Sequence, residues 1–274
     1  MRNVIPEQQH VFECAQAENL PVALPSFGVS SEQCHNSPVR FAPKLALFLA
    51  ALSALAQTPA APPLTTDQIV AKLTERNRVR AATLKGYTGK RTYRLDYHGF
   101  PGSKSAEMVV EARYIAPSEK QFRIVSETGS KLILNRVFHR LLTSEQEALD
   151  PENQRETAMT TENYDFKLER EELDNGRRNF VLRVEPKRKN KFLFRGLIWV
   201  DAQDFAVSRI EAEPAKNPSF WISKTSVQHR YSKIGDFWLP AQNVSKTDVR
   251  LGGDATLTIE YRDYIISTPI PDKR

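Results

Sequence analysis

The sequence predicts a mainly β protein with helices (α+β): a large curled antiparallel sheet that forms an incomplete β-barrel, with amphipathic helices covering its concave face. From Arg91 onward, most segments alternate apolar and polar residues with the two-residue period of a strand. Short connections rich in Gly, Asn and Asp separate these segments, as in β-hairpins. Two other segments, 66–84 and 132–149, repeat their apolar residues every three or four positions, which is typical of helices.

The region before this domain resembles an export signal that lies away from the start of the chain. Residues 39–56 combine Arg40 and Lys44 with an uncharged apolar run at 45–56, which is too short for a bilayer span of ~20 residues. We therefore expect a signal peptide cleaved before Gln57 and a periplasmic location. Residues 1–38 are either a disordered extension or a start-site misassignment, with Val39 as the true start. A membrane anchor with 1–38 inside is a third interpretation.

Charge and cysteine content exclude several classes of protein. Cys14 and Cys34 both precede the predicted cleavage site, so residues 57–274 contain neither a disulfide framework nor a thiolate metal site. The net charge of +6 is dispersed, apart from the group Arg76, Arg78 and Arg80 and the basic stretch at 187–191. In an exported protein this charge favours anionic lipids or anionic partners over nucleic acid. We expect a monomer that binds no nucleic acid.

The first half of the domain begins with a linker at 57–65, which is rich in proline. Thr65 and Gln68 form a capping-box pattern that opens the helix at 66–84. A strand meander follows at 91–97, 106–114 and 122–126. The helix at 132–149, which Asp150 and Pro151 end, interrupts the strands and must bury its apolar face on the apolar face of the sheet.

The second half consists of strands up to residue 266, followed by a short C-terminal tail at 267–274. We expect these strands at 162–173, 178–186, 192–201, 205–214, 219–232, 236–249 and 254–266. With the three earlier strands they make about ten. A sheet of this size curls because twist accumulates from strand to strand.

Residue patterns that support catalysis or metal binding are weak. His98, His139 and His229 are isolated in the sequence, so none is expected to bind zinc or to act in catalysis. The carboxylates of 201–204 lie between two strands, which favours a hairpin turn over a calcium loop. We expect no cofactor and no metal.

Aromatic residues form a clearer pattern than the candidate catalytic residues, because many of them lie after residue 191. They are Phe192, Phe194, Trp199, Phe205, Phe220, Trp221, Tyr231, Phe237, Trp238, Tyr261 and Tyr264. In a curled sheet many of them point inward. They form either a filled core or the wall of an apolar cavity that shields lipid tails, where each buried methylene contributes ~0.8 kcal/mol.

Three segments of the C-terminal half carry a family resemblance. They are Gly196-Leu-Ile-Trp-Val-Asp201, Phe205-Ala-Val-Ser-Arg-Ile-Glu211 and Tyr231-Ser-Lys-Ile-Gly-Asp-Phe-Trp-Leu-Pro240. With the order of elements across 66–266, they resemble the periplasmic outer-membrane lipoprotein carrier and sorting proteins, a LolA-like group related to the N-terminal domain of RseB and MucB. The charged segment 144–156 does not match that group.

The resemblance implies a non-enzymatic chaperone whose apolar cavity takes the acyl chains of lipoproteins or of another lipid. It also implies an inner-membrane release complex and an outer-membrane acceptor as partners. An arginine on an early strand would lock the helical lid, and Arg91 and Arg94 are the candidates. The cavity candidates are Leu95, Tyr97, Met108, Val110, Phe122, Ile133, Val137, Phe138, Leu141, Phe180, Leu182, Trp199, Phe220, Trp221, Phe237, Trp238, Leu257, Ile259 and Tyr261.

Two other functions remain open at this point. One is a regulatory lipid-binding module that senses envelope stress through a partner. The other is a hydrolase of envelope polymers, which needs a pair of carboxylates in a cleft. Glu211, Glu213 and Glu260 are available for that role, although no pattern singles them out.

Overall fold

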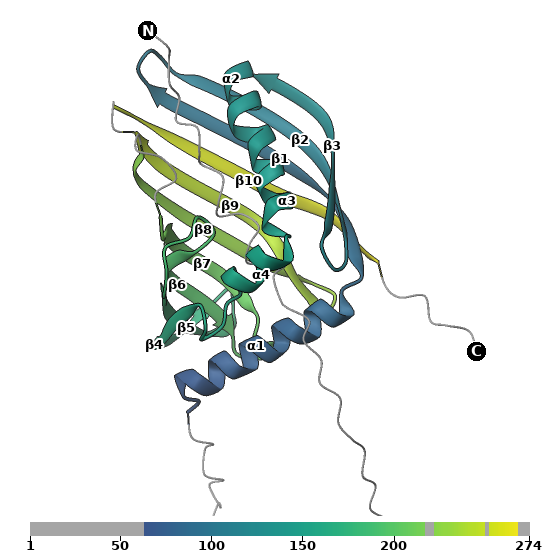
Figure 1. Ribbon diagram of the computed structural model, residues 1–274, viewed down its shortest axis with the longest axis vertical. Coiled ribbons are helices and arrows are strands. Elements are labelled where there is room, and N and C mark those ends of the chain that lie inside the picture. Colours follow the sequence, from purple (N-terminus) through teal and green to yellow (C-terminus); the bar gives the residue numbers. More distant parts are fainter. Residues whose placement is uncertain (1–62, 217–221, 250–251, 268–274) are drawn as a thin grey trace, which may run out of the picture. The chain divides into compact units, whose positions relative to one another are not determined.

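The computed structural model describes residues 63–216, 222–249 and 252–267 (Figure 1). The expected signal peptide, the segment before it, most of the linker, Phe220, Trp221 and residues 268–274 lie outside these ranges.

Ten antiparallel strands form one sheet, as the sequence predicts. Their bounds agree with the expected strands to within a few residues, and β1 and β3 are longer than expected. The strands are β1 (Gly86–Gly99), β2 (Lys104–Ile115), β3 (Glu119–Gly129), β4 (Tyr164–Asp174), β5 (Arg177–Pro186), β6 (Phe194–Asp201), β7 (Val207–Pro214), β8 (Ile222–Ile234), β9 (Phe237–Val249) and β10 (Gly253–Ser267).

The strand order is β3-β2-β1-β10-β9-β8-β7-β6-β5-β4. All neighbours but one are consecutive in the chain. The exception is the pair of β1 and β10, which joins the two ends of the domain in the middle of the sheet. This order makes β3 and β4 the edges, and the chain between these edges is helical. A helical insert therefore stands where a hairpin between β3 and β4 would have closed the barrel.

Helix α1 (Thr66–Thr83) opens with the predicted capping box. The Thr65 hydroxyl accepts from the backbone N–H of Gln68 at 3.3 Å, and the Gln68 side chain accepts from the backbone N–H of Thr65 at 2.9 Å. Figure 1 shows α1 lying across one end of the strands. Its buried side consists of Ile69, Val70 and Leu73.

The helical insert has four parts rather than the single helix predicted at 132–149. They are α2 (Lys131–Ile133), the π-helical turn η1 (Leu134–Phe138), α3 (His139–Ala148) and α4 (Pro151–Thr157). Asp150 does not end the helical region, because its carboxylate accepts from the backbone N–H of Glu152 at 2.9 Å and so caps α4. Pro151 takes the first helical turn, where proline is tolerated. In Figure 1 the segment from α2 to α3 runs along the face of β1, β2 and β3. We call the face that it covers the inner face.

A backbone restriction at Gly196 gives the first prediction. The φ angle of Gly196 is 151°, and a Cβ atom there would lie 2.2 Å from the backbone oxygen of Glu211 on β7. We expect Gly196→Ala to lower the free energy of unfolding by at least about 2 kcal/mol in urea denaturation. Gly176→Ala is the control, since its φ is 76° with no atom within 4 Å. It should cost about 1 kcal/mol. Equal losses would contradict the assignment of the clash to β7.

Candidate functional site

The apolar side of the helical insert packs on the inner face of β1, β2 and β10. Ten of the predicted cavity residues lie in this one buried cluster: Leu95, Met108, Val110, Ile133, Val137, Phe138, Leu141, Leu257, Ile259 and Tyr261. Tyr97 and Phe122 are half-buried against it. Residues from the strands and from the insert therefore meet, and the insert covers the apolar surface of the sheet.

A buried carboxylate ties the insert to the sheet. Glu145 of α3 forms an ion pair with Arg91 of β1 at 2.5 Å and with Lys120 of β3 at 3.1 Å. The hydroxyl of Tyr93 donates to the same carboxylate at 3.1 Å. Both side chains of each ion pair are no more than 3% exposed. We call these four residues the Glu145 anchor.

The surroundings of Arg91 keep it charged. Its guanidinium lies over the rings of Tyr261 at 5.0 Å and Phe122 at 5.5 Å. Burial by itself lowers the pKa of Arg91, but Glu145 and the neighbouring tyrosines raise that pKa well above its usual range. Because the cluster is cut off from water, removing one charge would leave the others without compensation.

The two lid-lock candidates differ in position. Arg91 reaches α3 through Glu145. Arg94 lies on the outer face, half-exposed, and its ion pair at 2.6 Å is with Glu107 of the neighbouring strand β2. Only Arg91 is therefore placed to hold the insert, and the exposed pair of Arg94 stabilises the sheet by less than about 1 kcal/mol.

Two further contacts join α3 to the edge strand β3. His139 Nε2 lies 2.5 Å from the Glu127 carboxylate, and the side-chain amide of Gln146 donates to the backbone oxygen of Lys120 at 3.1 Å. Sequence reasoning missed the partners Glu145 and Glu127. The sequence nevertheless contains a sign of the role of Glu145. Its spacing puts it on the same side of the helix as Phe138, Leu141 and Leu142, and a charged residue on a buried apolar side needs a partner of opposite charge.

The other predicted aromatic and apolar candidates divide between the two faces. Phe180 and Leu182 lie on the inner face, opposite Val200 and Ile198 of β6. Trp199 pairs with Val181 and so points to the outer face, since side chains alternate along a strand. There it lies under Arg209 at 4.3 Å, and its indole N–H donates to Glu172 at 2.5 Å.

Phe237 and Trp238 lie beside α1 rather than under the insert. With Arg76, Arg80 and Ala206 they line a pocket of about 250 Å³. The indole N–H of Trp238 donates to Asp204 at 2.9 Å. Trp199, Phe237 and Trp238 therefore lie apart from the cluster under the insert. Phe220 and Trp221 lie outside the described residues.

Polar residues cross the inner face between its two apolar regions. We call them the polar strip, and they are Thr225, His229, Asn243, Ser245 and Thr247, all buried, on β8 and β9. Alternation and register place them on the inner face, because Asn243 pairs with Ile259 and Ser245 with Leu257. The imidazole of His229 stacks on Tyr231 at 4.5 Å and on Tyr261 at 6.1 Å.

His229 is held neutral. Burial, helped by the nearby charge of Arg91, lowers its pKa from 6.5 to about 3, although Glu145 acts in the opposite direction. In the sequence this histidine is an isolated residue of a strand. In the structure it is linked to the Glu145 anchor, since Tyr261 contacts both the imidazole and the Arg91 guanidinium.

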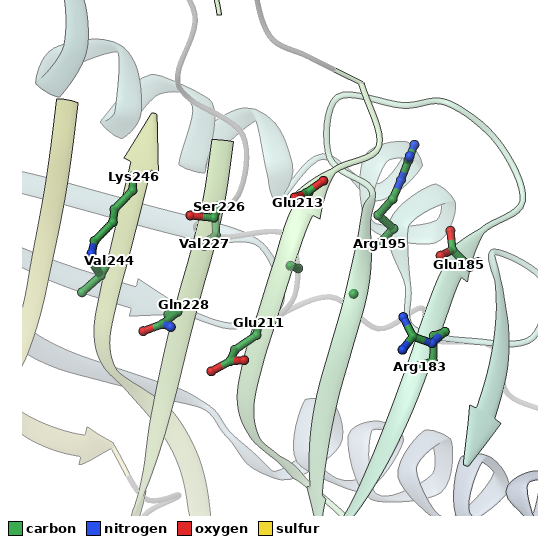
Figure 2. Close-up of a pocket in the computed structure, with 12 residues that line it drawn as sticks. Arg183, Glu185, Arg195, Glu211, Glu213, Ser226, Val227, Gln228, Val244 and Lys246 are labelled. Carbon is green, nitrogen blue, oxygen red and sulfur yellow. The ribbon is translucent and has the colours of Figure 1, made fainter. Parts of the chain in front are cut away.

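The outer face carries a charged groove of about 540 Å³ over β5 to β9 (Figure 2). Figure 2 shows Arg183, Arg195, Glu211 and Glu213 around it, with Lys246 on the far side. Its polar, mixed-charge lining does not suit an acyl chain. Gly196 and Ala212 form its floor.

The three glutamates considered for hydrolysis all have basic partners. Glu211 pairs with Arg209, Glu213 with Lys224 and Glu260 with Arg262. A catalytic carboxyl group must face its substrate, whereas each of these three carboxylates faces a basic side chain of the protein. These contacts do not favour the hydrolase hypothesis.

The turn at 201–204 forms as predicted. The Asp201 carboxylate accepts from the backbone N–H groups of Gln203 at 3.0 Å and Asp204 at 2.8 Å, and it pairs with Arg177 at 2.6 Å. Burial raises the pKa of Asp201, but Arg177 and the two backbone donors outweigh it and lower that pKa overall. Its oxygens are therefore used within the hairpin.

Within the described ranges, none of the helices is both long and apolar enough to pass through a bilayer.

A family described only as a family of unknown function, DUF5686, matches residues 157–263. That match covers β4 to most of β10 and omits α1, β1 to β3 and most of the helical insert. No curated protein matches the chain.

Several solved structures are similar to this one. A domain of Vibrio parahaemolyticus described as an outer membrane lipoprotein-sorting protein domain matches with 13% identity and a TM-score of 0.42, over 74% of this chain and 94% of its own. A DUF1329 family protein of Desulfovibrio piger matches with 15% identity and a TM-score of 0.39, over 76% and 95%. A LolA superfamily protein of Nitrosomonas europaea matches with 11% identity and a TM-score of 0.34, over 77% and 97%.

The similarity to lipoprotein-sorting proteins that the sequence motifs predict is thus found among solved structures as well.

The Glu145 anchor gives the second prediction. Glu145→Gln leaves Arg91 and Lys120 buried without their carboxylate, which should lower the free energy of unfolding by about 3–5 kcal/mol. The matched control is Glu107→Gln, which breaks the exposed pair with Arg94 and should cost less than about 1 kcal/mol. Urea denaturation measures both, and hydrogen exchange should show the loss concentrated in α3. Similar losses in the two variants would contradict the anchoring role.

The neutral state of His229 gives the third prediction. The unfolded chain takes up a proton near pH 6.5, while the folded protein does so only near pH 3. The free energy of unfolding should therefore fall as the pH drops through this window, by up to about 1.4 kcal/mol per pH unit from this group. His229→Phe should remove that part of the slope in urea denaturation between about pH 7 and about pH 5. An unchanged slope would show that the folded protein protonates His229.

Proposed function

We propose that this protein is a periplasmic, non-enzymatic carrier that binds the acyl chains of lipoproteins, or of another lipid, on the inner face of its sheet. It would transfer them toward the outer membrane. The observation that carries the proposal is the way the helical insert is held. Its apolar side covers an apolar sheet surface, yet a buried ionic cluster fixes it in place.

The Glu145 anchor suits a lid better than a permanent core. A buried ion pair is weak evidence for stability, because apolar residues of similar volume often stabilise a core as well or better. It does define one docked position of α3 against β1 and β3. Leaving that position breaks all contacts of one carboxylate together, so the insert has a discrete closed state that can be released as a unit.

The exposed surface would then need an apolar ligand. Lifting the insert uncovers Leu95, Met108, Val110, Leu257 and Ile259 on the sheet. Each methylene that covers this surface again contributes about 0.8 kcal/mol, so an acyl chain can replace the packing that the helix gives up. The apolar residues of the insert itself, such as Phe138 and Leu141, would face the same chain.

Two features of the sequence support transport from the inner to the outer membrane. The expected signal peptide at 39–56 would place the domain in the periplasm. The motif resemblance implies an inner-membrane complex that loads the carrier and an outer-membrane acceptor that unloads it.

Photocrosslinking tests the proposal and gives the fourth prediction. We would replace Phe122, half-buried on the inner face, with photoreactive p-benzoylphenylalanine, and the adjacent exposed Arg123 with the same residue as a control. After expression in a bacterial envelope and irradiation, mass spectrometry should find acyl lipid or lipoprotein attached at position 122 and not at position 123. Absence of lipid at position 122, or equal labelling of both positions, would contradict the proposal.

A further inference from the structure

Two buried polar atoms of the polar strip have no hydrogen-bond partner among the described residues. They are His229 Nε2 and Asn243 Nδ2. The two residues are 2% and 0% exposed and are direct partners in the register of β8 and β9. Their side chains therefore leave the same face of the sheet as neighbours. Buried polar atoms are nearly always paired, so two adjacent exceptions need an explanation.

Asn243 Nδ2 is a donor, and His229 Nε2 is a donor in the tautomer that carries its proton there. The side-chain oxygen of Asn243 accepts from the Ser245 hydroxyl at 3.3 Å, so its NH₂ group remains to be satisfied. The Tyr231 hydroxyl lies 3.4 Å from His229 Nδ1. When that hydroxyl donates, the proton of the neutral imidazole is on Nε2. In that tautomer two adjacent buried donors face the same side of the sheet, and an acceptor oxygen would satisfy both.

The surroundings identify the kind of molecule that carries this oxygen. Asn243 lies beside Ile259 in the register of β9 and β10, and Ile259 belongs to the apolar surface under the insert. On the other side of the strip, Ile210 of β7 is the register partner of His229, and it continues the inner face toward Leu182 and Ile198. A ligand that fits has one acceptor group and an apolar chain.

We propose that His229 and Asn243 bind the carbonyl or carboxylate oxygen of an acyl ligand whose chain lies on the inner face. This inference rests on the proposed function and deepens it, because it fixes where the polar end of the ligand binds. The Tyr261 ring contacts both the His229 imidazole and the Arg91 guanidinium, so the site adjoins the Glu145 anchor. The site recognises the acyl group through its oxygen, whether the group is a free fatty acid or an ester.

The test compares how tightly the full-length protein binds three probes that share a hydrocarbon chain: dodecanoate, methyl dodecanoate and dodecane. Binding is followed by displacement of the fluorescent apolar probe N-phenylnaphthylamine. Asn243→Leu and His229→Phe keep side-chain size while removing the donors. Thr225→Val is the matched control, since Thr225 lies on the same strip with its hydroxyl 3.1 Å from that of Thr247.

Asn243→Leu should weaken dodecanoate and methyl dodecanoate by about tenfold and leave dodecane unchanged, because one hydrogen bond is lost. His229→Phe should act in the same direction, and Thr225→Val should change none of the three affinities. Without ligand, Asn243→Leu should melt at the same or a higher temperature, since it removes an unpaired buried donor.

Unchanged affinities for both acyl probes in Asn243→Leu and His229→Phe would overturn the inference and leave the carrier function standing. Equal weakening of dodecane, with a lower melting temperature, would show that the two residues act only in packing and would also overturn it. Failure of all three probes to bind the unmodified protein would instead overturn the carrier function itself.

Discussion

One carboxylate determines how the two parts of this domain fit together. Glu145 lies on the inserted helix, and its partners Arg91, Tyr93 and Lys120 come from two strands of the sheet. Hydrophobic packing alone is tolerant of sliding, because apolar contacts have no direction. A buried charge has only one satisfactory position, so the anchor gives α3 a fixed docking on the inner face. Whatever binds on that face must either fit around this position or displace it.

The fold follows from local patterns in the sequence, and the site does not. Alternation and turn residues specify the strands, because each strand hydrogen-bonds mostly to its neighbours in the chain. The division of the helical segment at 134–138 was not predicted, since a π-helical turn has no signature of its own in the apolar period. Helix α4 was missed for another reason. Asp and Pro occur both just after the end of a helix and at the start of one, so Asp150 and Pro151 alone do not show that a new helix begins.

The functional residues depend on contacts between distant segments. Arg91 could be singled out as a candidate, but its partner Glu145 lies 54 residues further along the chain. His229 looked isolated because its neighbours Asn243 and Tyr261 come from other strands. A local signal was nevertheless present in β9, where Asn243, Ser245 and Thr247 give the inward positions polar side chains in a sheet whose other inward positions are mostly apolar. A strand that is polar on both faces within a large sheet therefore indicates a site rather than a core.

The pairing of β1 with β10 has a consequence for the order in which the chain folds. Tyr93 pairs with Ile259, so the centre of the sheet is made from segments at opposite ends of the domain. Contacts between residues this far apart in the chain cost a large loop-closure entropy and form late. The sheet of β1 to β3 cannot join that of β4 to β9 before β10 is present, because β10 lies between them. A growing chain would therefore remain incompletely folded until its final residues emerge. For the periplasmic carrier proposed above, this delay would keep the chain unfolded while it crosses the membrane.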